Sequence, residues 1–115
     1  MSSNFENLDV WKKACRLNVD VWKLLTDSKE YWIRDQMLRS ALSIPSNIAE
    51  GCDRGGNTEF KRFLNIAKAS AAELRTQLYI AMETKVCSAQ RAKQLTSELV
   101  VITKMLQALI NSLNN

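Results

Sequence analysis

Histidine is absent from this chain of 115 residues. Without an imidazole the protein cannot build a Ser-His-Asp or Cys-His catalytic centre, a histidine-ligated metal site or a histidine-based pH switch. The three cysteines, Cys15, Cys52 and Cys87, are far apart and form no Cys-x-x-Cys pair, which argues against a zinc site or a redox pair. We therefore expect no catalytic residue, no metal and no cofactor, and we classify the chain as a non-enzymatic protein.

Glycine and proline are also scarce, with three and one residues respectively. A β-sandwich or small barrel needs turn residues about every 8–12 positions, so this composition argues against both and favours long helices. Apolar residues make up 46% of the chain and charged residues 24%, which is typical of a globular protein. The length suits one domain, and we expect residues 1–115 to form it.

Long apolar runs are missing as well. No segment approaches the roughly 20 apolar residues that span a bilayer, and the opening residues 1–4 lack the charged-then-apolar pattern of a signal peptide. Three separated thiols suit a reducing compartment. We expect a cytoplasmic protein with no membrane contact.

Apolar residues recur every three or four positions in four segments. Helices are expected over residues 8–26 and 31–53, then from Phe60 to Ala81 and from Ala92 to Leu113, with Asn57 or Thr58 capping the third and Ser88 the fourth. Their similar lengths and short connections predict an all-α fold, an antiparallel up-down-up-down four-helix bundle. Pro45 interrupts the second segment without shifting its periodicity, which predicts one kinked helix.

A stripe of polar residues follows one face of the second helix. Its members, spaced three or four apart, are Gln36, Ser40, Ser43, Asn47, Glu50 and Arg54. The structural interpretation is that Ser43 and Asn47 bond backbone carbonyls left without a donor by Pro45, or that the stripe makes a hydrogen-bonded subunit contact. We favour this interpretation over a ligand site.

Positive charge is in modest excess, with a formal net charge of +4. Five cations gather around the glycine-rich turn and the third helix: Arg54, Lys61, Arg62, Lys68 and Arg75. Three of them are seven residues apart and share a helix face, as an interface with regularly spaced phosphates requires. No aromatic residue interleaves with the row, and a solvated helix face is the favoured alternative. Separately, residues 31–33 (Tyr-Trp-Ile) form an apolar patch suited to a protein partner.

The segment Ser43-Ile44-Pro45-Ser46-Asn47-Ile48-Ala49-Glu50-Gly51 closely resembles the signature of the four-helix-bundle proteins encoded by 23S rRNA intervening sequences. The likeness extends from about Phe5 to Leu113. It implies a four-helix bundle that assembles as a homopentamer with a central channel and has no established enzymatic activity. A related branch, the accessory variability proteins of diversity-generating retroelements, binds a reverse transcriptase and nucleic acid through a basic surface, so the resemblance also implies contact with RNA or DNA.

Two functional hypotheses follow. The first is a non-enzymatic, pentameric bundle protein that contacts RNA or a nucleoprotein through the five cations named above, with salt-sensitive binding and little sequence preference. The alternative is a protein–protein scaffold or adaptor with no direct nucleic-acid contact, in which the patch at residues 31–33 meets the partner.

Overall fold

The computed structural model describes residues 4–113. A short 3-10 helix, η1 (Phe5–Asn7), precedes four long helices: α1 (Asp9–Leu25), α2 (Tyr31–Asp53), α3 (Asn57–Glu83) and α4 (Ala89–Ser112). No strand occurs in this part of the chain, and the four helices pack as a bundle of 45 × 20 × 20 Å. The all-α four-helix fold predicted from the apolar spacing is confirmed.

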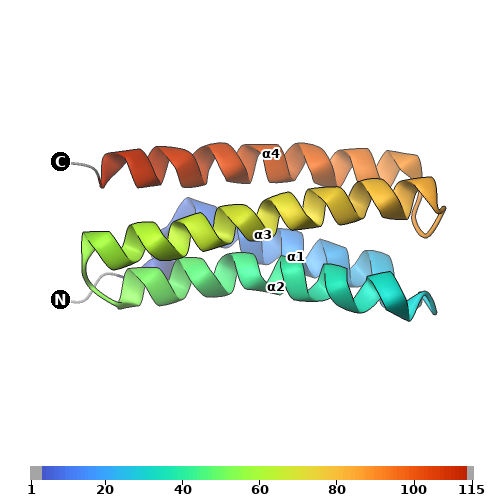
Figure 1. Cartoon of the computed structure of the whole chain (residues 1–115), viewed down its shortest axis with the longest axis horizontal. Coiled ribbons are helices and arrows are strands. Elements are labelled where there is room, and N and C mark those ends of the chain that lie inside the picture. The colour runs from blue at the N-terminus through green and yellow to red at the C-terminus, as the bar shows by residue number, and fades with distance from the viewer. Residues whose placement is uncertain (1–3, 114–115) are drawn as a thin grey trace.

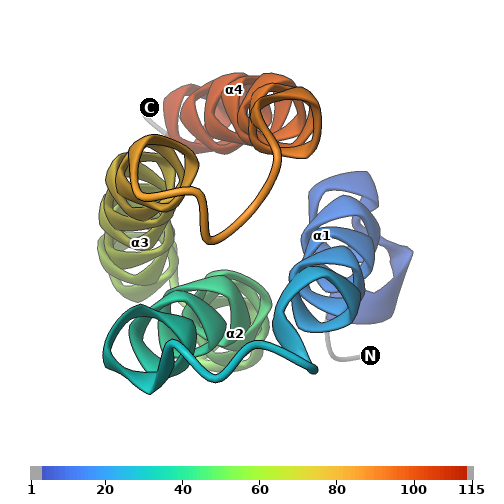
Figure 2. The same cartoon turned by 90° about the vertical axis from the view of Figure 1, so that its right-hand side faces the viewer.

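The helices follow one another around the bundle axis in chain order, so each lies beside the next and α4 lies beside α1 (Figure 2). Viewed from the side, the colour gradient reverses direction from each helix to the next (Figure 1). The face between α1 and α2 is therefore opposite the face between α3 and α4.

All four helices contribute buried apolar side chains to one core, at the three- and four-residue spacing seen in the sequence. Full burial of a leucine or isoleucine side chain stabilises the fold by about 1.5–3 kcal/mol. The largest fully buried side chains are Leu17, Leu25, Met37, Ile44, Ile48, Leu64, Leu74, Leu78, Leu95, Leu99, Ile102 and Leu106. None of the helices between residues 4 and 113 combines the length and apolarity needed to cross a membrane.

Of the two helix caps expected from the sequence, the structure confirms one. Ser88 caps α4 as expected, because its Oγ accepts a hydrogen bond from the backbone N–H of Arg91 at 3.1 Å. The expected cap of α3 by Asn57 or Thr58 is wrong: the helix begins at Asn57, and its cap is Gly56, which has no side chain to contribute. Gly55, with φ of +88°, supplies the left-handed turn residue between α2 and α3.

Pro45 lies in the interior of α2 and is buried. The helix continues on both sides of it as one element, as the uninterrupted periodicity predicted. The kink expected at this residue stays a prediction.

Candidate functional site

The signature segment, residues 43–51, packs the second helix against the third. Ile44 and Ile48 are completely buried in the core. At the end of the segment, a Cβ atom added to Gly51 would lie 2.6 Å from Cβ of Phe63, closer than packed carbon atoms approach. Glycine at this position therefore permits the close approach of α2 to α3.

Polar groups of the same segment join the two helices. The hydroxyls of Ser43 on α2 and Ser70 on α3 share a hydrogen bond of 2.8 Å. Asn47 donates through Nδ2 to the backbone carbonyl of Ser43 at 2.8 Å and to its Oγ at 2.9 Å. These three residues form a hydrogen-bonded seam, because a buried hydroxyl needs a partner and each of the two serines supplies one for the other.

Ser43 and Asn47 were expected to bond the backbone carbonyl left without a donor by Pro45, and the structure shows a different hydrogen bond. Proline lacks the N–H that would bond the carbonyl four residues earlier, which belongs to Ala41. Asn47 instead donates to the carbonyl of Ser43. The bond from Ser43 to Ser70 thus connects α2 with α3, both bonds from Asn47 stay within α2, and none of them reaches the carbonyl of Ala41.

The remaining members of the polar stripe lie in different surroundings. Ser40 is buried, whereas Gln36, Glu50 and Arg54 are exposed. On the facing helix, Oε1 of Gln77 is buried and accepts no hydrogen bond from any described residue. The stripe is therefore an interhelix seam in its middle and solvent-exposed at its ends.

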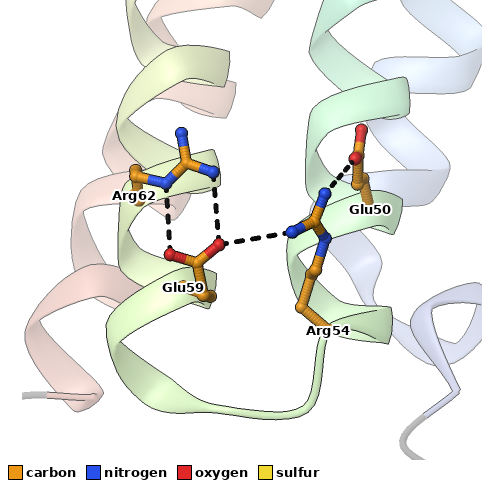
Figure 3. A network of polar contacts seen from close by, with 4 residues as sticks. All are labelled: Glu50, Arg54, Glu59 and Arg62. Atoms are coloured by element: carbon orange, nitrogen blue, oxygen red, sulfur yellow. Dashed lines mark hydrogen bonds and ion pairs between the residues drawn. The ribbon is translucent and has the colours of Figure 1, made fainter.

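The turn between α2 and α3 carries a network of four charged side chains (Figure 3). Arg54 contacts Glu50 through Nη2 at 2.9 Å and Glu59 through Nη1 at 3.6 Å. Arg62 donates to both carboxylate oxygens of Glu59, each at 3.2 Å. Both guanidinium groups also lie over the ring of Phe63, at 5.1 and 4.5 Å from its centroid.

Two arginines face two glutamates in this network, so their formal charges cancel. The hydrogen bond from Arg62 lowers the pKa of Glu59, assisted by the positive charges of Arg62 and Arg54. The same carboxylate raises the pKa of Arg62. Arg54 and Arg62 thus form ion pairs that stabilise the turn. The negative charges of Glu50 and Glu59 reduce the attraction that these two arginines exert on a polyanion.

The other three predicted cations lie along α3. Lys68 donates through Nζ to Oε1 of Gln107 on α4, and Arg75 lines a groove between the same two helices. Lys61 precedes Lys68 by seven residues and so shares this face. The structure therefore divides the predicted set of five into a compensated pair at the turn and a row of three beside α4.

The groove between α3 and α4 has a volume of about 690 Å³. Its lining combines aliphatic side chains, hydroxyls, one tyrosine and two cations: Ala72, Arg75, Thr76, Leu78, Tyr79, Met82, Ala92, Lys93, Thr96 and Ser97. No carboxylate lines it. Of three hollows, which lie between α3 and α4, between α1 and α2 and between α1 and α4, it is the one whose lining combines cations with an aromatic ring and includes no carboxylate.

Tyr79 and Lys93 were missed in the sequence. Tyr79 follows Arg75 by four residues and is 61% exposed, so an aromatic ring lies beyond the end of the basic row, although none interleaves with it. The signal was the spacing of residues 61, 68, 75 and 79 on one helix face. Lys93 had no such signal, because its proximity to Arg75 depends on how α4 is rotated against α3.

Apolar side chains are exposed on the opposite face of the bundle, between α1 and α2. Trp22 and Leu42 are 55% and 56% exposed, and they line a hollow of about 300 Å³ with Asn18, Val19 and Leu38. This surface carries no charged lining residue.

The predicted patch at residues 31–33 is only partly exposed. Tyr31 and Trp32 are exposed, with Nε1 of Trp32 donating to Glu30 at 2.9 Å and the Arg34 guanidinium 4.5 Å above the Tyr31 ring. Ile33 is 3% exposed and belongs to the core, so its inclusion in the patch was wrong.

The described residues hold no cluster of three acidic or thiol side chains with the arrangement of a metal site. Burial raises the pKa of the Cys15 and Cys87 thiols, which keeps both in the unreactive protonated form at neutral pH.

A third hollow lies between α1 and α4. Its lining mixes cations with Asp9, Asp20 and Glu98.

Comparison with known proteins places this geometry in a family. The family model described as 23S rRNA-intervening sequence protein matches residues 6–108. A crystal structure from Bacteroides thetaiotaomicron, of a protein with unknown function from the S23 ribosomal protein family, is similar with a TM-score of 0.82 and 28% sequence identity, over 88% of this chain and 97% of that chain. No curated protein matches the chain.

Proposed function

The chain belongs to the 23S rRNA-intervening sequence protein family, and from this membership we propose that it is a non-enzymatic helical assembly protein that binds RNA through the α3–α4 face. The observation that carries the proposal is the row formed by Lys61, Lys68 and Arg75, continued across the groove by Lys93. Regularly spaced cations displace counterions from a phosphate backbone, and this displacement supplies affinity without sequence preference.

Arg54 and Arg62 have a smaller part in this proposal than in the sequence hypothesis. Each already contacts a glutamate, so binding a phosphate would require breaking an existing ion pair. For Arg75 and Lys93, no carboxylate stands among the residues that line the groove.

The second element of the proposal is assembly, with a homopentamer as the expected state. The support is the exposed apolar surface around Trp22 and Leu42, because exposed apolar surface rimmed by polar residues marks contact sites. In a cyclic assembly each such surface meets a different surface of the neighbouring copy. This face is opposite the α3–α4 face (Figure 2), so the basic row of a copy stays open to solvent when the second surface used in the ring is not the α3–α4 face. Five copies would present the row five times, which raises avidity.

The test is charge reversal at three positions. Lys61→Glu, Lys68→Glu and Arg75→Glu together should weaken binding of a fluorescently labelled RNA oligonucleotide at least tenfold, because loss of three phosphate contacts removes about two units of the salt dependence, at roughly 0.7 per contact. The matched control carries Lys23→Glu, Lys29→Glu and Arg39→Glu, which change the net charge equally at exposed positions elsewhere. Equal affinity of the wild-type protein and the α3 variant would contradict the proposal.

A scaffold that binds another protein is the second candidate, and the exposure of Trp32 (58%) favours it. The two candidates differ in one result. An assembled wild-type protein that binds no RNA at low salt would favour the scaffold, and Trp32→Ala would then be expected to weaken the partner complex.

A further inference from the structure

The α3–α4 groove is lined by one exposed aromatic ring and two cations. Arg75 and Tyr79 are one helical turn apart on α3, and Lys93 lines the same groove from α4. The volume of about 690 Å³ lies within the range of about 300–1,000 Å³ that small-ligand sites occupy. The groove is thus large enough for one nucleotide.

Each part of the lining matches one part of a nucleotide. A tyrosine ring that is 61% exposed has a free face on which a planar base can stack. The two cations can contact phosphates, and the hydroxyls of Thr76, Thr96 and Ser97 can exchange hydrogen bonds with ribose or base edges.

We propose that this groove binds an unpaired nucleotide of single-stranded RNA, with its base stacked on Tyr79 and its phosphates in contact with Arg75 and Lys93. The inference rests on the proposed RNA binding and specifies which form of RNA is bound and where. A base within a duplex is stacked on its neighbours and cannot lie on a side chain, so the site selects single strands.

Two further hollows do not match this ligand. The one between α1 and α4 has three carboxylates beside its three cations, so its formal charges cancel, and it has no aromatic ring in its lining. The one between α1 and α2 has no cation in its lining. Charge complementarity therefore selects the α3–α4 groove.

Lys61 and Lys68 extend the site along α3. From Lys61 to Tyr79 the helix advances 18 residues, or about 27 Å at 1.5 Å per residue. The bound strand would follow this line, with its backbone on the lysines and one base on the tyrosine.

The experiment compares Tyr79→Ala with Tyr79→Phe in the full chain, using an end-labelled single-stranded oligouridylate of twelve nucleotides and a twelve-base-pair RNA duplex as probes. Tyr79→Ala should weaken single-strand binding at least about fivefold, since stacking is lost. Tyr79→Phe keeps a ring and should bind as the wild type does. Neither change should alter duplex binding or the salt dependence, because no phosphate contact is removed.

The matched control is Tyr31→Ala. Tyr31 is the other tyrosine of the chain, is 54% exposed and also lies beside an arginine, but it belongs to α2. Its replacement should leave single-strand binding unchanged. A photo-crosslink from 4-thiouridine to the peptide that contains Tyr79, absent in Tyr79→Ala, gives an independent readout.

The outcomes separate the two proposals. If Tyr79→Ala binds the single strand like the wild type while the charge-reversed α3 variant does not, the stacking site is wrong and RNA binding stands. If the wild-type protein prefers the duplex, the stacking site is also wrong. If the wild type binds neither probe at low salt, both proposals are overturned.

Discussion

Gly51 of α2 and Phe63 of α3 lie in direct contact, and a Cβ atom on the glycine would come within 2.6 Å of the phenylalanine Cβ. Neither atom belongs to a flexible side-chain end, so relief requires a shift of one helix against the other. The contact thus fixes how closely the two helices approach at the end of the signature segment.

Gly51→Ala is expected to destabilise the bundle by about 1–3 kcal/mol, the usual effect of overpacking a core. Urea unfolding followed by circular dichroism measures the change. Gly56→Ala is the reference, because an added methyl there meets no atom within 4 Å; it measures the smaller cost, about 0.5 kcal/mol, of placing alanine at the N-cap of α3. A Gly51→Ala variant as stable as Gly56→Ala would contradict the packing argument.

The hydrogen bond between Ser43 and Ser70 predicts coupling between the two positions. In a double-mutant cycle with Ser43→Ala and Ser70→Ala, we expect a coupling free energy of about 0.5–1.5 kcal/mol, typical of one hydrogen bond. Ser46 is exposed, so Ser46→Ala should change stability by less than about 0.5 kcal/mol. If the effects of the two serine replacements on the free energy of unfolding are additive, the hydrogen bond between the two hydroxyls does not stabilise the fold.

The lowered pKa of Glu59 predicts a specific pH dependence of stability. A carboxyl group whose pKa is lower in the folded state stabilises the fold above its unfolded pKa of about 4.3, and this contribution disappears as the pH falls through the folded value. The difference in urea midpoint between the wild type and Glu59→Gln should thus be present at pH 7 and shrink below about pH 4. The network is exposed, so the difference is small and should decrease further in 1 M salt.

Glu73→Gln provides the reference for this measurement, because Glu73 is an exposed carboxylate on the same helix. The two variants should differ at neutral pH and converge in acid. If the difference in urea midpoint between the two variants grows as the pH falls, the prediction that Arg62 lowers the pKa of Glu59 is contradicted.

Assembly through the α1–α2 face predicts that Leu42→Lys reduces the oligomer to monomer, since it places a charge in the proposed contact. Native mass spectrometry measures the distribution of species. Val101 on α4 is exposed to a similar degree, 47% against 56%, so Val101→Lys is the control and should leave assembly intact. Dissociation by Val101→Lys alone would assign the contact to the α1–α4 face instead.

The fold was predictable because each helix carries its own apolar spacing, a local property of the sequence. The bounds of α2 agree with the expected range, and Ser88 caps α4 as a local motif should. Gly56 was not recognised as the cap of α3, because a glycine cap leaves no side-chain signal.

The candidate site was only half predictable. The spacing of seven residues between Lys61, Lys68 and Arg75 identifies one helix face from the sequence alone. The ion pair between Arg54 and Glu59 depends on the path of the turn between two helices. The presence of Lys93 in the same groove as Arg75 depends on how α4 is rotated about its axis. Neither relationship has a fixed spacing in the sequence.

The alternation of helix direction also determines how the protein can be attached to a surface. The start of α1 and the end of α4 lie at one end of the bundle, and the connection between α3 and α4 lies at the other (Figure 1). Tyr79 is four residues from the end of α3, near that far connection. A tether at either chain end would therefore orient the tyrosine end of the groove toward bulk solution, and immobilised protein would keep it accessible to a probe.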